Sequence, residues 1–147
     1  WQLNSIMTVQ SGSPIALIAP GTSGAITANR PNVVAGQNPK LDNPTIAKWF
    51  NTAAFSVPAP FTMGNASRTL PNAATDGVFN LDFSVLKDFV LTEKTKLQFR
   101  AEAFNLTNTP TFGTPDRNVN SRTFGVVNST AFYPKPREVQ LALRLTF

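Results

Sequence analysis

The chain has 147 residues, of which 41% are hydrophobic and 14% are charged, and its formal net charge is +5. This composition excludes a highly charged disordered tail, and the longest apolar run, residues 15–19, is far shorter than the roughly 20 residues of a membrane-spanning helix. Because the sequence holds no cysteine and no histidine, it excludes disulfides, thiolate nucleophiles, histidine-based metal sites and Ser-His-Asp or Cys-His catalysis.

Proline placement separates the candidate strands from the loops. All 12 prolines lie in two windows, residues 14–71 and residues 110–136. Proline lacks the backbone donor that a sheet ladder needs, so it is nearly excluded from the interior of sheets. The candidate strands are therefore the proline-free stretches, at residues 1–11, 78–91, 95–107 and 137–147.

The first two stretches alternate apolar with polar residues, the pattern of a strand with two different faces. Residues 1–11 alternate with one slip, at Ser5 and Ile6, and a long loop over residues 12–77 follows. We expect a helical turn over residues 46–50 of this loop. The apolar side of residues 78–91 is formed by Phe79, Leu81, Phe83 and Val85.

The second half of the chain repeats the pattern. A short polar turn at residues 92–94 fits a tight hairpin leading into the strand 95–107. A second long loop, over residues 108–136, follows, and we expect a short strand at 123–127 within it. The last strand is the most regular, because all its odd positions from 139 are apolar: Val139, Leu141, Leu143, Leu145 and Phe147.

These elements predict an all-β fold of antiparallel amphipathic strands over residues 1–147. A short turn between two long loops is typical of outer-membrane barrels, which have tight periplasmic turns and extended outer loops. The strand lengths also suit a tilted membrane crossing of roughly 9–11 residues. A soluble β-sandwich, such as a carbohydrate-binding module, alternates as cleanly, so the pattern alone leaves both architectures open.

Six segments in order carry a family resemblance: residues 1–14, 49–55 (WFNTAAF), 64–68 (GNASR), 80–89 (NLDFSVLKDF), 99–108 (FRAEAFNLTN) and 136–147 (PREVQLALRLTF). Together they resemble the C-terminal barrel region of TonB-dependent outer-membrane receptors, in particular the Oar-like, carboxypeptidase-regulatory-like group. The resemblance covers almost the whole chain, and it implies a single β-barrel segment over residues 1–147, part of a β-barrel or of a β assembly closed between copies. It implies a non-catalytic segment of an outer-membrane barrel that acts in surface binding and transport, with both long loops outside the cell.

The resemblance also implies partners. These are the remaining strands of the barrel, outer-membrane lipid, and the barrel assembly machinery, which would recognise the C-terminal strand ending at Phe147. Nucleic acid is not expected, because the 13 lysines and arginines are scattered and form no basic run or basic helical face.

Four strands are too few to close a barrel, since small closed barrels need about eight. An open sheet also presents edges of unpaired backbone groups that recruit further strands. Either the chain belongs to a larger receptor barrel in the outer membrane, or copies of it join edge to edge. The alternative prediction is therefore a self-assembling structural protein at the cell surface, a homo-oligomer that forms an extracellular ring or filament if this chain is complete.

No catalytic, cofactor-binding or metal-binding residue is predicted, and we expect no enzyme activity. Asp82 and Glu102 lie on adjacent strands, as the acid and base of a glycosidase would. Structural charges that face a polar barrel interior explain them better, together with Arg100 and Arg144, either solvated or paired across strands.

One aromatic group in the first loop has two interpretations. Trp49, Phe50, Phe55 and Phe61, with Arg68 nearby, either form a ligand-facing surface or anchor the loop onto the sheet. We favour the anchor, because a loop of this length stays ordered only if it buries apolar surface.

Overall fold

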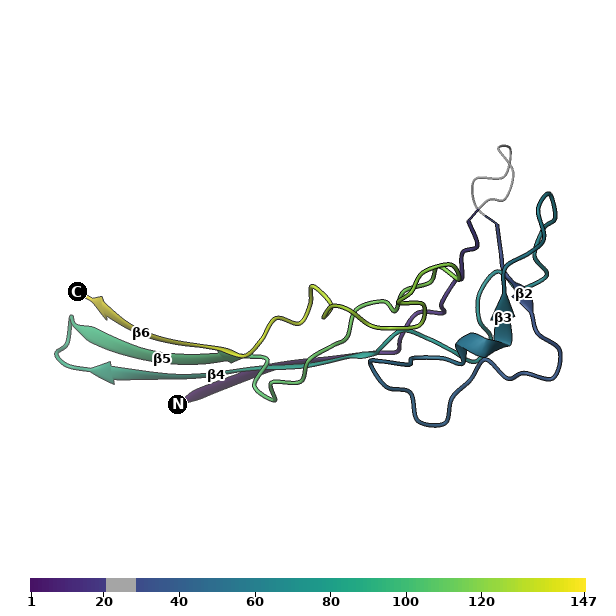
Figure 1. Ribbon diagram of the computed structural model, residues 1–147. Coiled ribbons are helices and arrows are strands. Elements are labelled where there is room, and N and C mark those ends of the chain that lie inside the picture. The colour runs from purple at the N-terminus through teal and green to yellow at the C-terminus, as the bar shows by residue number, and fades with distance from the viewer. Residues whose placement is uncertain (21–28) are drawn as a thin grey trace. The chain divides into compact units, whose positions relative to one another are not determined.

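The structure is a computed structural model that describes residues 1–20 and 29–147, so residues 21–28 of the first predicted loop lie outside the described part (Figure 1). The chain divides into two compact units. Residues 1–11, 77–111 and 132–147 form one, named here the sheet unit, and residues 12–76 and 112–131 form the other, named the loop unit. In the described part of the chain, no helix has the length and hydropathy to cross a membrane.

The sheet unit holds four antiparallel strands in the spatial order β1, β4, β5, β6 (Figure 1). They span Gln2–Gln10 (β1), Val78–Val90 (β4), Lys96–Phe104 (β5) and Glu138–Thr146 (β6). A tight turn joins β4 to β5, and in it the N–H of Thr95 donates to the carbonyl oxygen of Thr92 at 3.3 Å. The predicted all-β antiparallel fold, with four long strands and one short hairpin, is confirmed.

The register extends the alternation of single strands to the whole sheet. Val85 lies opposite Leu3 of β1 and Ala101 of β5, and Ala101 lies opposite Leu141 of β6. Every odd residue of the sheet is thus paired with an odd residue. Because successive side chains point to opposite faces, the odd residues form one face and the even residues form the other.

β5 is shorter than the predicted strand 95–107, because Asn105 adopts a left-handed φ of 48°. This conformation turns the backbone out of the extended path. The next N–H, that of Leu106, then donates to the carbonyl oxygen of Leu81 at 2.7 Å. The ladder therefore ends at Phe104.

The loop unit is mostly irregular. Its regular elements among the described residues are the short strands β2 (Asn32–Val33) and β3 (Phe55–Ser56) and the 3-10 turn η1 (Thr52–Ala54). The helical turn predicted at residues 46–50 is wrong, since η1 lies after it. Residues 46–47 form a turn, Lys48 an isolated bridge with Thr45, and residues 49–50 a bend. The strand predicted at 123–127 is also wrong, because the N–H of Val126 donates to the carbonyl oxygen of Thr123 at 2.8 Å and closes a turn.

The loop unit has a hydrophobic core of its own. Phe50 is fully buried, and its ring packs edge to face against Phe55 and Phe124, with centroids 6.2 and 5.2 Å away. Ile15 and Leu70 are buried in the same cluster. Burying side chains of this size contributes about 1.5–3 kcal/mol each, which offsets the entropy of ordering a segment without a ladder.

A buried amide supplies part of the hydrogen bonding that a ladder would provide. Asn29 is 3% exposed, and its Oδ1 accepts from the N–H groups of Arg30 at 2.8 Å and Gly64 at 3.1 Å. Two chain segments approach closely here, because a Cβ on Gly64 would lie 1.8 Å from the carbonyl oxygen of Arg30. Glycine at position 64 is therefore required by the packing of the backbone.

Candidate functional site

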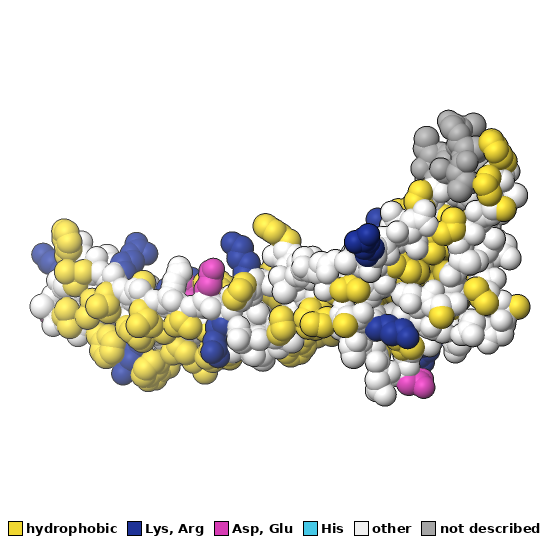
Figure 2. Space-filling model, viewed as in Figure 1, with side chains coloured by type: hydrophobic (Ala, Val, Ile, Leu, Met, Phe, Trp, Pro, Cys, Tyr) yellow, Lys and Arg dark blue, Asp and Glu magenta, His cyan; other side chains and the backbone are white. Residues whose placement is uncertain are grey.

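The odd face of the sheet is a broad exposed apolar surface. Met7, Val9, Leu141 and Leu143 are each 65–70% exposed. Figure 2 shows hydrophobic side chains gathered over the four-stranded sheet. Soluble monomers rarely expose a continuous apolar patch that covers a whole sheet. This face therefore requires an apolar environment, which lipid or another apolar surface supplies.

The even face carries most of the charges of the sheet. Arg100 forms an ion pair with Glu102, two residues away on the same strand. Asp82 accepts hydrogen bonds from the backbone N–H of Asn105 at 2.9 Å and from the side-chain amide of Asn80 at 3.0 Å. Arg144 lies opposite Gln98 and has no ion-pair partner among the described residues. In the part of the chain that the structure describes, no ion pair joins two of these charges across strands, which was one of the two expectations for them.

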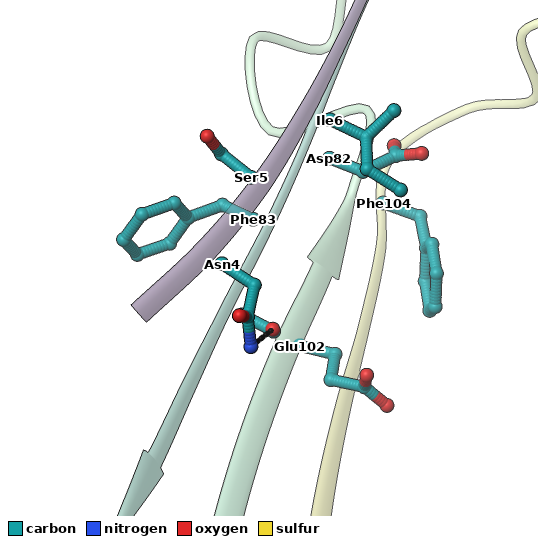
Figure 3. A pocket seen from close by; sticks show the side chains of 8 residues that line it. Asn4, Ser5, Ile6, Asp82, Phe83, Glu102 and Phe104 are labelled. Carbon is teal, nitrogen blue, oxygen red and sulfur yellow. Dashed lines mark hydrogen bonds between the residues drawn. The ribbon is translucent and has the colours of Figure 1, made fainter. Parts of the chain in front are cut away.

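The structure does not place Asp82 and Glu102 as an acid–base pair. Asp82 is opposite Ile6, whereas Glu102 is opposite Ser84. Figure 3 shows the two carboxylates apart, around a shallow cavity of about 110 Å³ that Asn4 and Phe104 also line. Ligand pockets usually measure roughly 300–1,000 Å³, so this cavity is too small to serve as one.

A polar network holds the segments that follow β5 and precede β6. Asn105 is 3% exposed, and its Nδ2 donates to the carbonyl oxygen of Lys135 at 2.8 Å, while its Oδ1 accepts from the N–H of Thr109 at 3.2 Å. The buried amide of Asn80 donates to the hydroxyl of Tyr133 at 2.9 Å. Sequence reasoning noted Asn105 only within a motif, because neither burial nor these partners can be read from alternation.

The outer edges of the sheet are open. β1 and β6 are the two terminal strands of the sheet, and neither has a partner on its outer side among the described residues. All three pairings are antiparallel, so β1 and β6 also run in opposite directions. Such edges can pair with further strands that continue the alternation.

The loop unit contains a larger groove, of about 400 Å³. Trp49 lies in its wall, with its indole N–H donated to the carbonyl oxygen of Ala74 at 2.8 Å and its ring edge to face with Phe112. Asp76 is held by the N–H of Phe112 at 2.9 Å. The lining is Lys40, Leu41, Asp42, Pro44, Trp49 and residues 72–76. The volume suits a small ligand, and sequence reasoning missed all these residues except Trp49.

The predicted aromatic group is divided by the structure. Phe50 and Phe55 are buried in the core of the loop unit, and Trp49 packs against that core. Phe61 is 82% exposed, and Arg68 is exposed too. The buried members therefore stabilise the loop unit itself, and Phe61 and Arg68 stand outside that core.

Asp116 organises a turn of the loop unit. Its carboxylate accepts from the N–H of Asn118 at 3.0 Å and from the hydroxyl of Thr123 at 2.7 Å. Burial raises the pKa of Asp116, but hydrogen bonds from Ser121, Asn118 and Thr123 together outweigh it and hold the pKa below its ordinary value of 3.8. Within residues 1–20 and 29–147, no group of three or more acidic side chains is placed to hold a metal ion.

Comparison with known proteins identifies the family. The sequence matches the outer membrane beta barrel domain family over residues 1–140. No curated protein and no solved structure matches the chain significantly. The match agrees with an amphipathic antiparallel sheet that is not closed. Of the two architectures that the alternation left open, it supports the outer-membrane barrel over the soluble sandwich. The chain belongs to the outer membrane beta barrel domain family, and its location is the bacterial outer membrane.

Proposed function

We propose that the chain is a non-catalytic segment of a TonB-dependent-receptor-like barrel that acts in surface binding and transport. The observation that carries this proposal is the sheet itself, which has one apolar face, one polar face and two open edges. In an outer-membrane barrel the apolar face contacts lipid and the polar face lines the interior. The most specific segment of the resemblance, 99–108, lies in β5 and the turn after it, and the segment 80–89 lies in β4.

The strand directions support completion by further strands of a barrel. β1 and β6 run in opposite directions, so an even number of additional antiparallel strands closes the sheet. Bacterial outer-membrane barrels have even strand numbers, of eight or more. The open edges are then paired, as lipid requires, because unpaired backbone groups cost several kcal/mol each in the hydrocarbon region.

The loop unit supports a role in surface binding. Its two segments connect β1 to β4 and β5 to β6, and these connections leave the sheet at the end away from the β4–β5 turn. Short turns of such barrels face the periplasm and long connections face the outside. We therefore assign the loop unit to the outer surface of the cell and its 400 Å³ groove to ligand binding.

The size of the purified chain, measured by sedimentation velocity with and without detergent, tests this function. We expect the 147-residue chain to aggregate in buffer, because its odd face and both edges are uncovered. Detergent, or co-refolding with the upstream part of its receptor, should give a discrete species. A monomer that stays soluble without detergent would contradict a lipid-facing sheet.

A second function is favoured by the same open edges. The outer side of β6 of one copy can accept β1 of the next copy with antiparallel polarity, so copies can join head to tail. The product is a structural ring if the rotation closes, or a filament if it does not. Rings or filaments in negative-stain electron microscopy without detergent would favour this self-assembling structural protein over the receptor segment.

A further inference from the structure

We propose that Lys87, Trp1 and Phe89 form a binding site for the phosphate group of an anionic phospholipid. The site lies on the odd face of the sheet, toward the β4–β5 turn. The proposal rests on the lipid-facing role of that face, and it adds a specific contact to an otherwise apolar surface.

Lys87 is a charged residue on the apolar face of the sheet. It is the only charged residue at the odd positions of the four strands. It lies directly opposite Phe99, which in turn lies opposite Leu143. Among the described residues the only ion pair joins Arg100 to Glu102, so no carboxylate neutralises this ammonium group. A half-buried charge of this kind requires an acceptor from outside the sheet.

Two aromatic rings hold the ammonium group in position. The Nζ atom of Lys87 lies 4.7 Å from the ring centroid of Trp1 and 4.6 Å from that of Phe89. Both distances lie within the range of about 6 Å for cation–π attraction. The rings orient the ammonium group but do not neutralise it, and its three N–H donors still require oxygen acceptors. A phosphate oxygen supplies both the charge and the acceptor.

The position along β4 matches the depth of lipid phosphates. Lys87 follows Phe79, the first odd residue of β4, by eight positions. At about 3.3 Å per residue this is about 26 Å along the strand. A strand tilted by about 40° then crosses about 20 Å of an apolar band that is about 25 Å tall. Lys87 and its two rings therefore lie close to one membrane boundary, where aromatic and lysine side chains meet headgroups.

Vesicle flotation of the whole chain, added to vesicles from its discrete detergent-solubilised form, tests the site. The probes are vesicles of phosphatidylcholine alone and vesicles that also contain phosphatidylglycerol. The variants are Lys87→Gln, Lys87→Arg and, as a matched control, Lys94→Gln in the exposed β4–β5 turn. We expect Lys87→Gln to lower the preference for phosphatidylglycerol about fivefold, the effect of one lysine near an anionic surface. Lys87→Arg should retain the preference.

The salt dependence of the vesicle preference distinguishes a specific binding site from general electrostatic attraction. Exposed charges are screened within about 8 Å at physiological ionic strength, whereas a partly buried pair is screened much less. The effect of Lys87→Gln should therefore persist in high salt, and any effect of Lys94→Gln should vanish. The proposal would be overturned if Lys87→Gln and Lys94→Gln lost the preference for phosphatidylglycerol equally and both losses disappeared at high salt. Unchanged preference in Lys87→Gln, with normal binding to both vesicles, would overturn the site alone and leave the proposed function standing.

A third outcome bears on the proposed function. If the chain and all three variants fail to bind either kind of vesicle, the odd face does not meet lipid. In that case both the site and the membrane role of the sheet are wrong.

Discussion

Asn105 ends β5 through its backbone and its side chain together. Its left-handed φ of 48° is tolerated by asparagine better than by most residues. Its buried amide contacts two segments, with Nδ2 donating to Lys135 and Oδ1 accepting from Thr109. The backbone N–H adds a bond to Asp82. One residue thus sets where the strand stops and where the chain re-enters the sheet.

Replacing Asn105 with alanine should destabilise the sheet unit by about 3 kcal/mol. The loss combines two buried hydrogen bonds, at about 1 kcal/mol each, with the strain of alanine at positive φ. Asn105→Gly is the matched control, because it loses the same bonds but tolerates the backbone conformation. We expect it to be about 1 kcal/mol more stable than Asn105→Ala in urea titrations in detergent. Equal stability of the two variants would show that the φ angle costs nothing here.

Asp116 predicts a pH dependence of the loop unit. Since hydrogen bonds depress its pKa in the folded state, this carboxylate stabilises the fold at pH values above its unfolded pKa, near 3.8. That stabilisation is lost as the pH falls through the lower folded pKa. In a Trp1→Phe background, where Trp49 is the remaining tryptophan, fluorescence should report a lower urea midpoint at about pH 3 than at about pH 5. Asp116→Asn should show a smaller difference, and an identical pH slope would exclude this role.

At the scale of the element, β1 shows that register overrides local pattern. The alternation of β1 slips at Ser5 and Ile6, yet the strand pairs residue for residue with β4 and contains no bulge. Ser5 consequently faces the apolar side opposite Phe83, and Ile6 faces the polar side opposite Asp82. The register assigns all side chains of a strand to the two faces together, because a shift by one residue would move every one of them to the other face.

A charge on the apolar face of β6 should prevent membrane assembly. Leu143 is 70% exposed on the odd face and lies opposite Phe99. Leu143→Asp should reduce detergent-dependent refolding, because a carboxylate that faces the apolar band of the membrane is destabilising, and less so toward the membrane boundary than at its centre. The matched control is Ala142→Asp, which places the same carboxylate on the even face opposite Arg100. Normal refolding of Leu143→Asp, measured by protease resistance, would refute the assignment of the faces.

At the scale of the whole molecule, the two units are stabilised in different ways. The sheet unit relies on its ladder and on whatever covers its odd face. The loop unit relies on an internal core around Phe50, which is 0% exposed. Damage to that core should therefore affect the loop unit far more than the strands.

Phe50→Ala should unfold the loop unit while the strand signal persists. Truncation of a buried phenylalanine costs about 3–5 kcal/mol, which is large against the stability of a small unit. Fluorescence of Trp49, which packs against this core, should report the loss, whereas circular dichroism should retain the β signal. The control is Phe61→Ala, because Phe61 is 82% exposed and its loss should change stability by about 0.5 kcal/mol or less. Simultaneous loss of both signals in Phe50→Ala would show that the units fold as one.

Proline placement and alternation alone determined four strands, one hairpin, two long loops and the two faces, because both signals are local. Tertiary structure decided the left-handed turn at Asn105, the pairing of β2 with β3, and the groove beside Trp49. Their residues are distant in sequence, and no periodicity relates Lys40 to Asp76. Tertiary structure also decided the contact of Lys87 with Trp1, because it depends on the pairing of β1 with β4. Local pattern specifies which face a side chain takes, and only the folded chain specifies its neighbours.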